Sequence, residues 1–167
     1  MGELEKMLQA NETFATGFDQ GRLEISPSRG VIVLTCIDAR LDPAKMLGLE
    51  LGDAHVVRNA GGRATADAIR SIAISSWLLG PREVAVIHHS GCGMTLFTNE
   101  ALRDKIRDEK GVDVGETDFF PFSDVDQSVR DDVERIRVEK SLPEDLAVSG
   151  YVYDVATGRI REVVPAG

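Results

Sequence analysis

Five residues in two short stretches of the chain have side chains that can hold and assist a metal ion. The first stretch is Cys36-Ile-Asp38-Ala-Arg40 and the second is His89-Ser-Gly-Cys92. Two thiolates and an imidazole are a donor set that zinc prefers in proteins. The chain has only two cysteines, and both fall in these stretches. We therefore predict one zinc site built from both cysteines and His89, with its fourth position open to Asp38 or to water.

The spacing of the first stretch gives Asp38 two alternative uses. Residues two apart face the same side of an extended segment, so Cys36, Asp38 and Arg40 can all face one pocket. Arg40 can hold Asp38 in a fork-like pair, and the carboxylate then accepts a hydrogen bond from a water on the metal. Released from Arg40, Asp38 can instead bind the metal and close the site. Zinc lowers the pKa of its water to about 7, so the open form would supply hydroxide at neutral pH.

Both stretches follow apolar runs that are typical of strands buried on both faces. Strands are expected at 31–35, 54–58 and 83–88, and in an open α/β sheet ligands collect at the carboxyl ends of such strands. We therefore expect the two stretches to meet at that edge. The spacing to Cys92 does not exclude His88 as the ligand in place of His89. Neighbouring strand residues face opposite sides, however, so only one of them should reach the metal, and His88 is expected in the core or an interface.

The remaining pattern predicts helices between these strands. Helices are expected at 4–18, from Asp42 onward, at 63–79, at 95–109 and from Ser123 or Asp124 to about Lys140. Residues 111–124 read as an irregular loop, and 146–154 and 159–163 as a closing strand pair. This alternation predicts a single α/β domain over 1–167 with a mainly parallel sheet flanked by helices, in which an N-terminal helical arm (1–29) precedes the core (30–167).

Composition limits the compartment and the partners. Hydrophobic residues make up 43% and charged residues 28%, which is ordinary for a globular domain. The net charge of −9 argues against a nucleic-acid partner. The chain lacks an apolar run long enough to span a bilayer and a signal-peptide layout at its start, so we expect a cytoplasmic setting with no membrane partner.

With these motifs in place, the chain resembles a β-class carbonic anhydrase of the compact prokaryotic branch. The stretches that carry the resemblance are Cys36-x-Asp38-x-Arg40, Arg58-Asn-Ala-Gly61 and His-His-Ser-Gly-Cys-Gly-Met94, and it extends over residues 4–164. It implies a four-stranded parallel core, helical arms that embrace a homodimer or higher homo-oligomer, and active sites near the subunit boundary.

The resemblance also implies roles for individual residues. Cys36, His89 and Cys92 would bind one Zn²⁺ per subunit. Asp38 would be the fourth ligand in a closed state or the acceptor for the water, switched by its pairing with Arg40. The turn Asn59-Ala60-Gly61 would line the pocket for CO₂. The implied activity is the reversible hydration of CO₂ to bicarbonate by zinc-bound hydroxide.

Two alternatives stay open at this stage. Carbonyl sulfide and carbon disulfide hydrolases resemble this compact branch, and the motifs do not separate them from carbonic anhydrases. A zinc-stabilised binding module with a permanently closed site would be non-catalytic, although a purely structural site does not require an arginine poised on one of its ligands.

Overall fold

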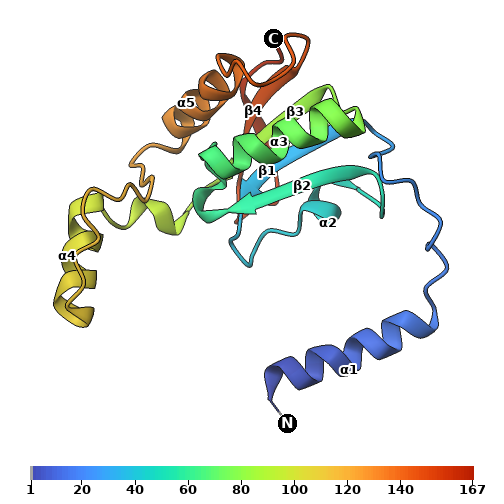
Figure 1. Ribbon diagram of the computed structural model, residues 1–167, viewed down its shortest axis with the longest axis horizontal. Helices are drawn as coiled ribbons and strands as arrows, with labels where there is room; N and C mark the ends of the chain where they lie inside the picture. The colour runs from blue at the N-terminus through green and yellow to red at the C-terminus, as the bar shows by residue number, and fades with distance from the viewer. Residues whose placement is uncertain (1) are drawn as a thin grey trace.

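A five-stranded sheet forms the centre of the protein in a computed structural model that describes residues 2–167 (Figure 1). Its order is β2-β1-β3-β4-β5, with the first four strands parallel and the last antiparallel to its neighbour. The prediction of one α/β domain with a mainly parallel sheet is confirmed. The strands are β1 (Val31–Cys36), β2 (Ala54–Asn59), β3 (Glu83–His89), β4 (Ala147–Tyr153) and β5 (Ile160–Val164).

Helices occupy most of the connections between strands, and several begin at a side chain that caps the first turn. Asp42, Thr65, Thr98 and Asp124 each accept a hydrogen bond from a backbone amide of the turn that follows. The α-helices are α1 (Glu3–Thr16), α2 (Pro43–Leu47), α3 (Ala66–Leu79), α4 (Asn99–Lys110) and α5 (Val125–Arg137), and the short 3₁₀ turns are η1 (Ala60–Gly62) and η2 (Gly93–Thr95).

The helix boundaries differ from the predicted ones for local reasons. α3 begins three residues later than expected, because Arg63 has an extended backbone (φ −75°, ψ 144°) and Thr65 caps the helix. α4 begins after η2, at the cap Thr98, instead of at Thr95. α5 ends at Arg137, short of the predicted Lys140.

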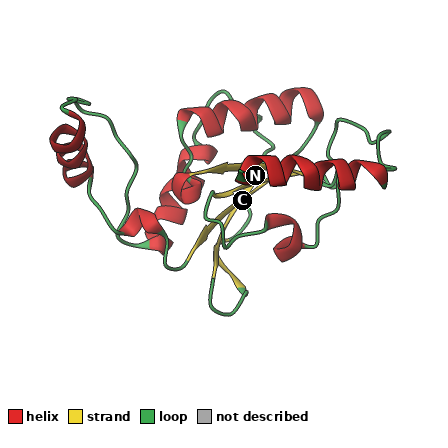
Figure 2. Ribbon diagram, turned by 90° about the horizontal axis from the view of Figure 1, so that it is seen from below, coloured by secondary structure: helices red, strands yellow, loops and turns green. Residues whose placement is uncertain are grey.

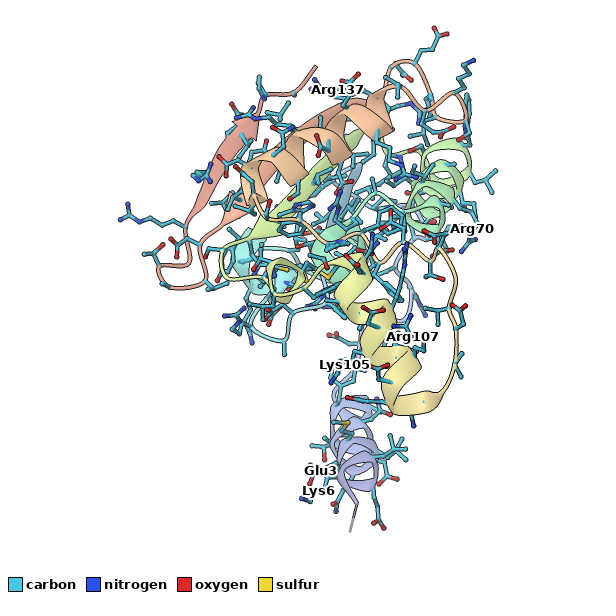
Figure 3. All side chains as sticks on the ribbon, turned by 90° about the vertical axis from the view of Figure 1, so that its left-hand side faces the viewer. Glu3, Lys6, Arg70, Lys105, Arg107 and Arg137 are labelled. Atoms are coloured by element: carbon cyan, nitrogen blue, oxygen red, sulfur yellow. The ribbon has the colours of Figure 1, made fainter. Side chains whose placement is uncertain are left out.

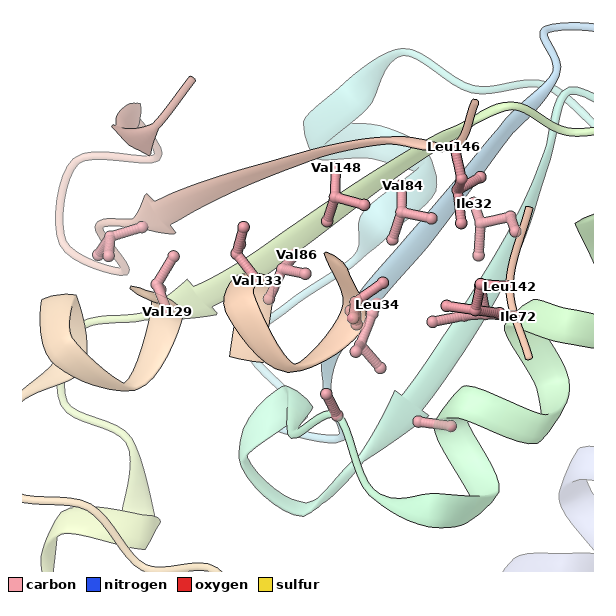
Figure 4. Close-up of a cluster of buried hydrophobic side chains, with 14 residues drawn as sticks. Ile32, Leu34, Ile72, Val84, Val86, Val129, Val133, Leu142, Leu146 and Val148 are labelled. Atoms are coloured by element: carbon pink, nitrogen blue, oxygen red, sulfur yellow. The ribbon is translucent and has the colours of Figure 1, made fainter. Parts of the chain in front are cut away.

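Helices α3 and α5 cover one face of the sheet and share its hydrophobic core with β1, β3 and β4 (Figure 4). Ile72 of α3 and Val129 and Val133 of α5 are almost fully buried there. Gly150 of β4 lets α5 approach closely, since a Cβ at this position would lie 2.5 Å from Val129 Cγ1. Besides Ile72, Val129 and Val133, the cluster includes Ile32, Leu34, Val84, Val86, Ile136, Leu142, Leu146, Val148 and Val152.

Two helices project from this body. Helix α4 and the loop after it extend to one side, and α1 stands off on the extended segment that leads to β1 (Figures 1 and 2). Figure 3, which labels Glu3 and Lys6 on α1 and Lys105 and Arg107 on α4, shows both helices reaching away from the sheet. Neither helix contains a buried residue. Among the described helices, none has the length and apolar character needed to cross a membrane.

The packing of α5 predicts a clear difference between two chemically identical substitutions. Val133→Ala, in the core at 2% exposure, should lower the free energy of unfolding by about 2–3 kcal/mol, because it removes two buried methyl groups and leaves a cavity. Val138→Ala, just beyond the same helix at 62% exposure, should change it by less than about 0.5 kcal/mol. Urea unfolding of both variants measures this, and equal losses would contradict the assignment of this core.

Candidate metal centre

The two cysteines and His89 meet at the carboxyl edge of the sheet. Cys36 is the last residue of β1, and His89 is the last residue of the neighbouring parallel strand β3. The chain then turns through Ser90 and Gly91, which has a φ of 61°, and delivers Cys92 back to the same place. The expected meeting of the two stretches is therefore present in the structure.

The three donor atoms are close enough to share one metal ion. All three lie within 4.8 Å of one another, and all three residues are buried. The sulfurs of Cys36 and Cys92 are 4.0 Å apart. Two sulfurs bound to one tetrahedral zinc at about 2.3 Å would be separated by about 3.8 Å, so the observed spacing fits such an ion.

His89 is held in the tautomer that a metal requires. Its Nδ1 lies 3.0 Å from the carbonyl oxygen of Ser90. Because a carbonyl only accepts, Nδ1 carries the hydrogen and Nε2 presents a lone pair. Nε2 is buried and has no hydrogen-bond partner among residues 2–167. A buried acceptor facing two thiols is costly unless something binds it, so this donor set fits a thiophilic metal ion.

One of the two thiols is predisposed to ionise. The hydrogen bond with the Cys92 thiol is the main cause that lowers the pKa of Cys36; burial opposes it, and the backbone N–H groups of Asp38 and Gly61 assist. The same shared hydrogen bond, together with burial, raises the pKa of Cys92. The thiolate is the form of cysteine that binds metals, and the pair therefore already holds one negative charge at the centre.

Asp38 and Arg40 form the fork that their spacing predicts. Arg40 donates from Nε to Oδ1 of Asp38 at 2.9 Å and from Nη2 to Oδ2 at 2.7 Å, and its backbone N–H also bonds Oδ1. A further bond from Nη2 to the carbonyl of Gly91 anchors Arg40 on the second loop. The side-chain bonds from Arg40 hold the pKa of Asp38 well below its usual range. The carboxylate is thus ionised, with Oδ2 3.7 Å from His89 Nε2.

Arg58 is a residue of this site to which the sequence pattern assigned no role. From the end of β2 its Nε donates to the carbonyl of Cys36 at 3.0 Å, and its Nη2 donates to the carbonyl of Asp38 at 2.9 Å. These bonds fix the backbone between the first thiol and the carboxylate. The only sequence signal for this role was the position of Arg58 within the Arg-Asn-Ala-Gly stretch.

The turn from Asn59 to Arg63 lies directly against the first cysteine. Gly61 donates its N–H to the Cys36 sulfur at 3.3 Å. The amide of Asn59 closes the turn on itself, since it bonds both the N–H and the carbonyl of Arg63 at 2.7 Å. Ala60 is exposed beside it. A role of Asn59, Ala60 and Gly61 in holding substrate stays a prediction.

The other histidines lie outside the donor cluster. His88 faces the opposite side of β3 from His89, as alternation along a strand requires, and is fully buried. Its Nδ1 lies 2.7 Å from Ser128 Oγ, and its Nε2 lies 3.1 Å from the carbonyl of Gly62. His55 pairs with Ser75 at 2.6 Å on the outer strand.

Apolar side chains surround the two thiols. Cys36 and Cys92 form a small buried cluster with Leu41 and Met94. Partly buried residues complete its wall: Met46, Phe97, Phe122, Tyr153 and Val155. The centre therefore combines one carboxylate with surroundings suited to an uncharged molecule.

Comparisons with known proteins agree on one family. A family model described as carbonic anhydrase matches residues 31–117. Beta-carbonic anhydrase 1 of Mycobacterium tuberculosis is 42% identical over 159 residues, which cover 95% of this chain and 96% of that protein. The crystal structure of a carbonic anhydrase from Streptococcus mutans superposes with a TM-score of 0.94 at 43% identity, covering 98% of each chain. Carbon disulfide hydrolase of Saccharolobus solfataricus is 33% identical over 83% of this chain and 79% of that protein.

Proposed function

Because the chain belongs to the β-carbonic anhydrase family, we propose that it catalyses the reversible hydration of CO₂ to bicarbonate and a proton. The observation that carries this proposal is the placement of the ionised Asp38, forked by Arg40, beside a cluster of two thiols and an imidazole. This arrangement can hold a metal ion and also direct a reactant next to it.

The donor set supports zinc as the cofactor, one ion per subunit, held by Cys36, His89 and Cys92. When bound, zinc lowers the pKa of a water molecule toward about 7 and so supplies a hydroxide nucleophile at neutral pH. Both cysteines are free thiols, which suits a reducing compartment. We accordingly place the protein in the cytoplasm as part of the proposal.

Asp38 orients the attacking water in this mechanism. An ionised carboxylate only accepts hydrogen bonds, so Asp38 receives the hydrogen of the water and turns the oxygen lone pair toward the carbon of CO₂. Arg40 keeps the carboxylate in this role by occupying both of its oxygens. Without the fork, Oδ2, which lies 3.7 Å from His89 Nε2, is near enough to move in as a fourth ligand and close the site.

The substrate pocket is proposed to lie between the Asn59-Ala60-Gly61 turn and the apolar wall around the thiols. CO₂ is small and uncharged, and side chains such as Met94 and Phe122 provide it with an apolar surface. Asn59 would shape this pocket through the turn that its amide closes. Gly61 would bring backbone close to the substrate.

A second candidate reaction uses the same residues. The relationship to carbon disulfide hydrolase supports hydrolysis of carbonyl sulfide or carbon disulfide, which are also linear and uncharged. Hydroxide attack on carbon is common to all three substrates, so the apolar wall and the access route would decide between them.

The two reactions are separated by side-by-side kinetics on protein of known zinc content. We expect stopped-flow CO₂ hydration with a kcat/KM at least about tenfold above that for carbonyl sulfide, measured by sulfide release; tenfold corresponds to about 1.4 kcal/mol of transition-state discrimination. A reversed ratio would favour the hydrolase. Zinc-loaded protein that is inactive on both substrates would refute the enzymatic proposal and favour a zinc-stabilised binding module.

Removal of the fork should impair the reaction while the metal stays bound. Arg40→Ala frees Asp38 to occupy the fourth position, and we expect kcat/KM for CO₂ to fall by about 10–100-fold with zinc content unchanged. The matched control is Arg103→Ala. It removes a guanidinium of the projecting helix α4 that pairs with Glu116, and it should leave kcat/KM unaltered. Full activity of the Arg40 variant would refute the gating role.

We propose a homodimer in which residues 1–29 form an arm that packs on the second copy. Helix α1 buries none of its residues in its own subunit, yet one face carries exposed apolar side chains: Leu4, Met7, Leu8 and Phe14. An isolated helix of this length is marginal in water, so this face needs a partner surface. The family resemblance supports a second copy of the chain as that partner.

The arm can be tested with two adjacent substitutions. Leu8→Asp places a charge on the apolar face of α1 and should shift the protein from dimer toward monomer in sedimentation analysis. Gln9→Asp places the same charge on the opposite face, since successive helical residues are about 100° apart, and should leave the dimer intact. Equal sedimentation of both variants would contradict the proposed interface.

A further inference from the structure

A buried ionic cluster joins α5 to the turn beside Cys36, and the chemistry proposed above does not use it. Asp132 of α5 accepts hydrogen bonds from Nε of Arg63 at 2.7 Å and from its Nη2 at 3.4 Å. The Nε2 of His88 lies 3.3 Å from the same carboxylate. The side chains of Asp132, Arg63 and His88 are only 3%, 11% and 0% exposed.

Stability alone does not account for this cluster. Removing two charges from water costs about as much as their attraction returns, and buried ion pairs are often replaceable by apolar side chains without loss. Burial by itself would raise the pKa of Asp132, but the bonds from His88 and Arg63 outweigh it and lower that pKa. The carboxylate is therefore charged in the core, where its clearest effect is to fix the groups that bind it.

Those groups, Arg63 and His88, both hold the turn that contacts the metal centre. Arg63 is the last residue of that turn, and His88 Nε2 bonds the carbonyl of Gly62 at 3.1 Å. The backbone of Gly62 packs directly against β1, since a Cβ on Gly62 would lie 2.9 Å from the carbonyl carbon of Thr35. Next to it, the N–H of Gly61 points at the sulfur of Cys36 at 3.3 Å.

The same guanidinium also fixes the loop that walls the site. Arg63 donates from Nη1 to the carbonyl of Phe120 at 3.1 Å and stands over the ring of Phe122 at 5.5 Å. Phe120 has a φ of 56°, a conformation that a non-glycine residue keeps only when its surroundings enforce it. The Arg63 side chain therefore links the turn to both α5 and the loop.

We propose that Asp132, through Arg63 and His88, positions the Gly61 N–H against the Cys36 sulfur and thereby sets the strength of the metal–thiolate bond. A hydrogen bond to a metal-bound thiolate withdraws charge from the sulfur, and such outer contacts tune both affinity and electronic structure. Asp132 and Arg63 are in this sense positioning residues and do not touch the reactants. The inference rests on the metal centre proposed above, and on no particular substrate.

The test replaces the carboxylate with an amide of the same shape and reads the metal directly. In Asp132→Asn we expect zinc affinity, measured by chelator competition, to fall about 10–100-fold. We also expect the thiolate-to-cobalt charge-transfer band of the Co²⁺-substituted protein to shift. Val133→Ala is the control: it is next to Asp132 on the same helix and costs stability in the core, where it packs over Gly150 of β4, so both metal readouts should match the wild type.

Two results with these variants would overturn the proposal. One is an Asp132→Asn protein that is folded and has unchanged zinc affinity and cobalt spectrum. The other is a Val133→Ala protein whose metal readouts move as far, since the effect would then follow from lost stability. If Asp132→Asn does not fold, Arg63→Lys takes its place, because it keeps the positive charge and removes the forked pair with Asp132. We expect the same changes in zinc affinity and in the cobalt spectrum. Wild-type values of both would refute the proposal.

This experiment is independent of the reaction. Zinc and cobalt binding are measured without CO₂ or carbonyl sulfide. A wild-type protein that binds zinc but hydrates no CO₂ would therefore refute the proposed activity and leave the positioning role to be judged by the metal readouts alone.

Discussion

The parallel pairing of β1 with β3 is the constraint on which the rest of the structure depends. In this register Thr35 lies opposite Ile87, so Cys36 and His89 emerge together at one edge of the sheet. Parallel strands end at the same edge, and there the chain can turn without breaking the ladder. Both strands are buried on both faces, and a slip by one residue would turn His88 toward the cysteines in place of His89.

Arginines hold the loops at this edge in place. Arg40 binds the carboxylate of Asp38 and the carbonyl of Gly91, which ties the loop after β1 to the loop after β3. Arg58 binds two carbonyls of the first loop. Arg63 ties the turn beside Cys36 to α5. A planar guanidinium presents several donors in fixed directions, so each arginine can satisfy loop carbonyls and a carboxylate that no regular ladder reaches.

Glycine makes the remaining close approaches possible. Gly62 rests on the backbone of Thr35 and Cys36, and Gly150 lies under Val129 and Val133 of α5. At both places a side chain would occupy space that backbone or core atoms already fill. The turn beside the candidate metal centre and helix α5 therefore both lie in close contact with the sheet.

The sequence alone predicted a large part of this arrangement. Continuous apolar runs identified the strands, helix caps such as Asp42 and Asp124 identified helix starts, and the donor types of Cys36, His89 and Cys92 indicated zinc. The fork between Asp38 and Arg40 also followed from local spacing, because residues two apart in an extended segment face the same way. The strands, the helix caps, the fork and the cluster of three donor residues are all present in the structure, and zinc in that cluster stays a proposal.

Only the tertiary structure decided which distant groups support the site. Nothing in the pattern pairs Asp132 with Arg63, 69 positions earlier, because both look like ordinary surface charges until α5 packs on the sheet. The start of α3 was likewise predicted too early, because Arg63, held by Asn59 and Asp132, has an extended backbone and the helix cap falls at Thr65. Local spacing and residue chemistry determined the candidate metal ligands and their carboxylate; long-range packing, where burial makes each unpaired charge costly, determined what holds them in place.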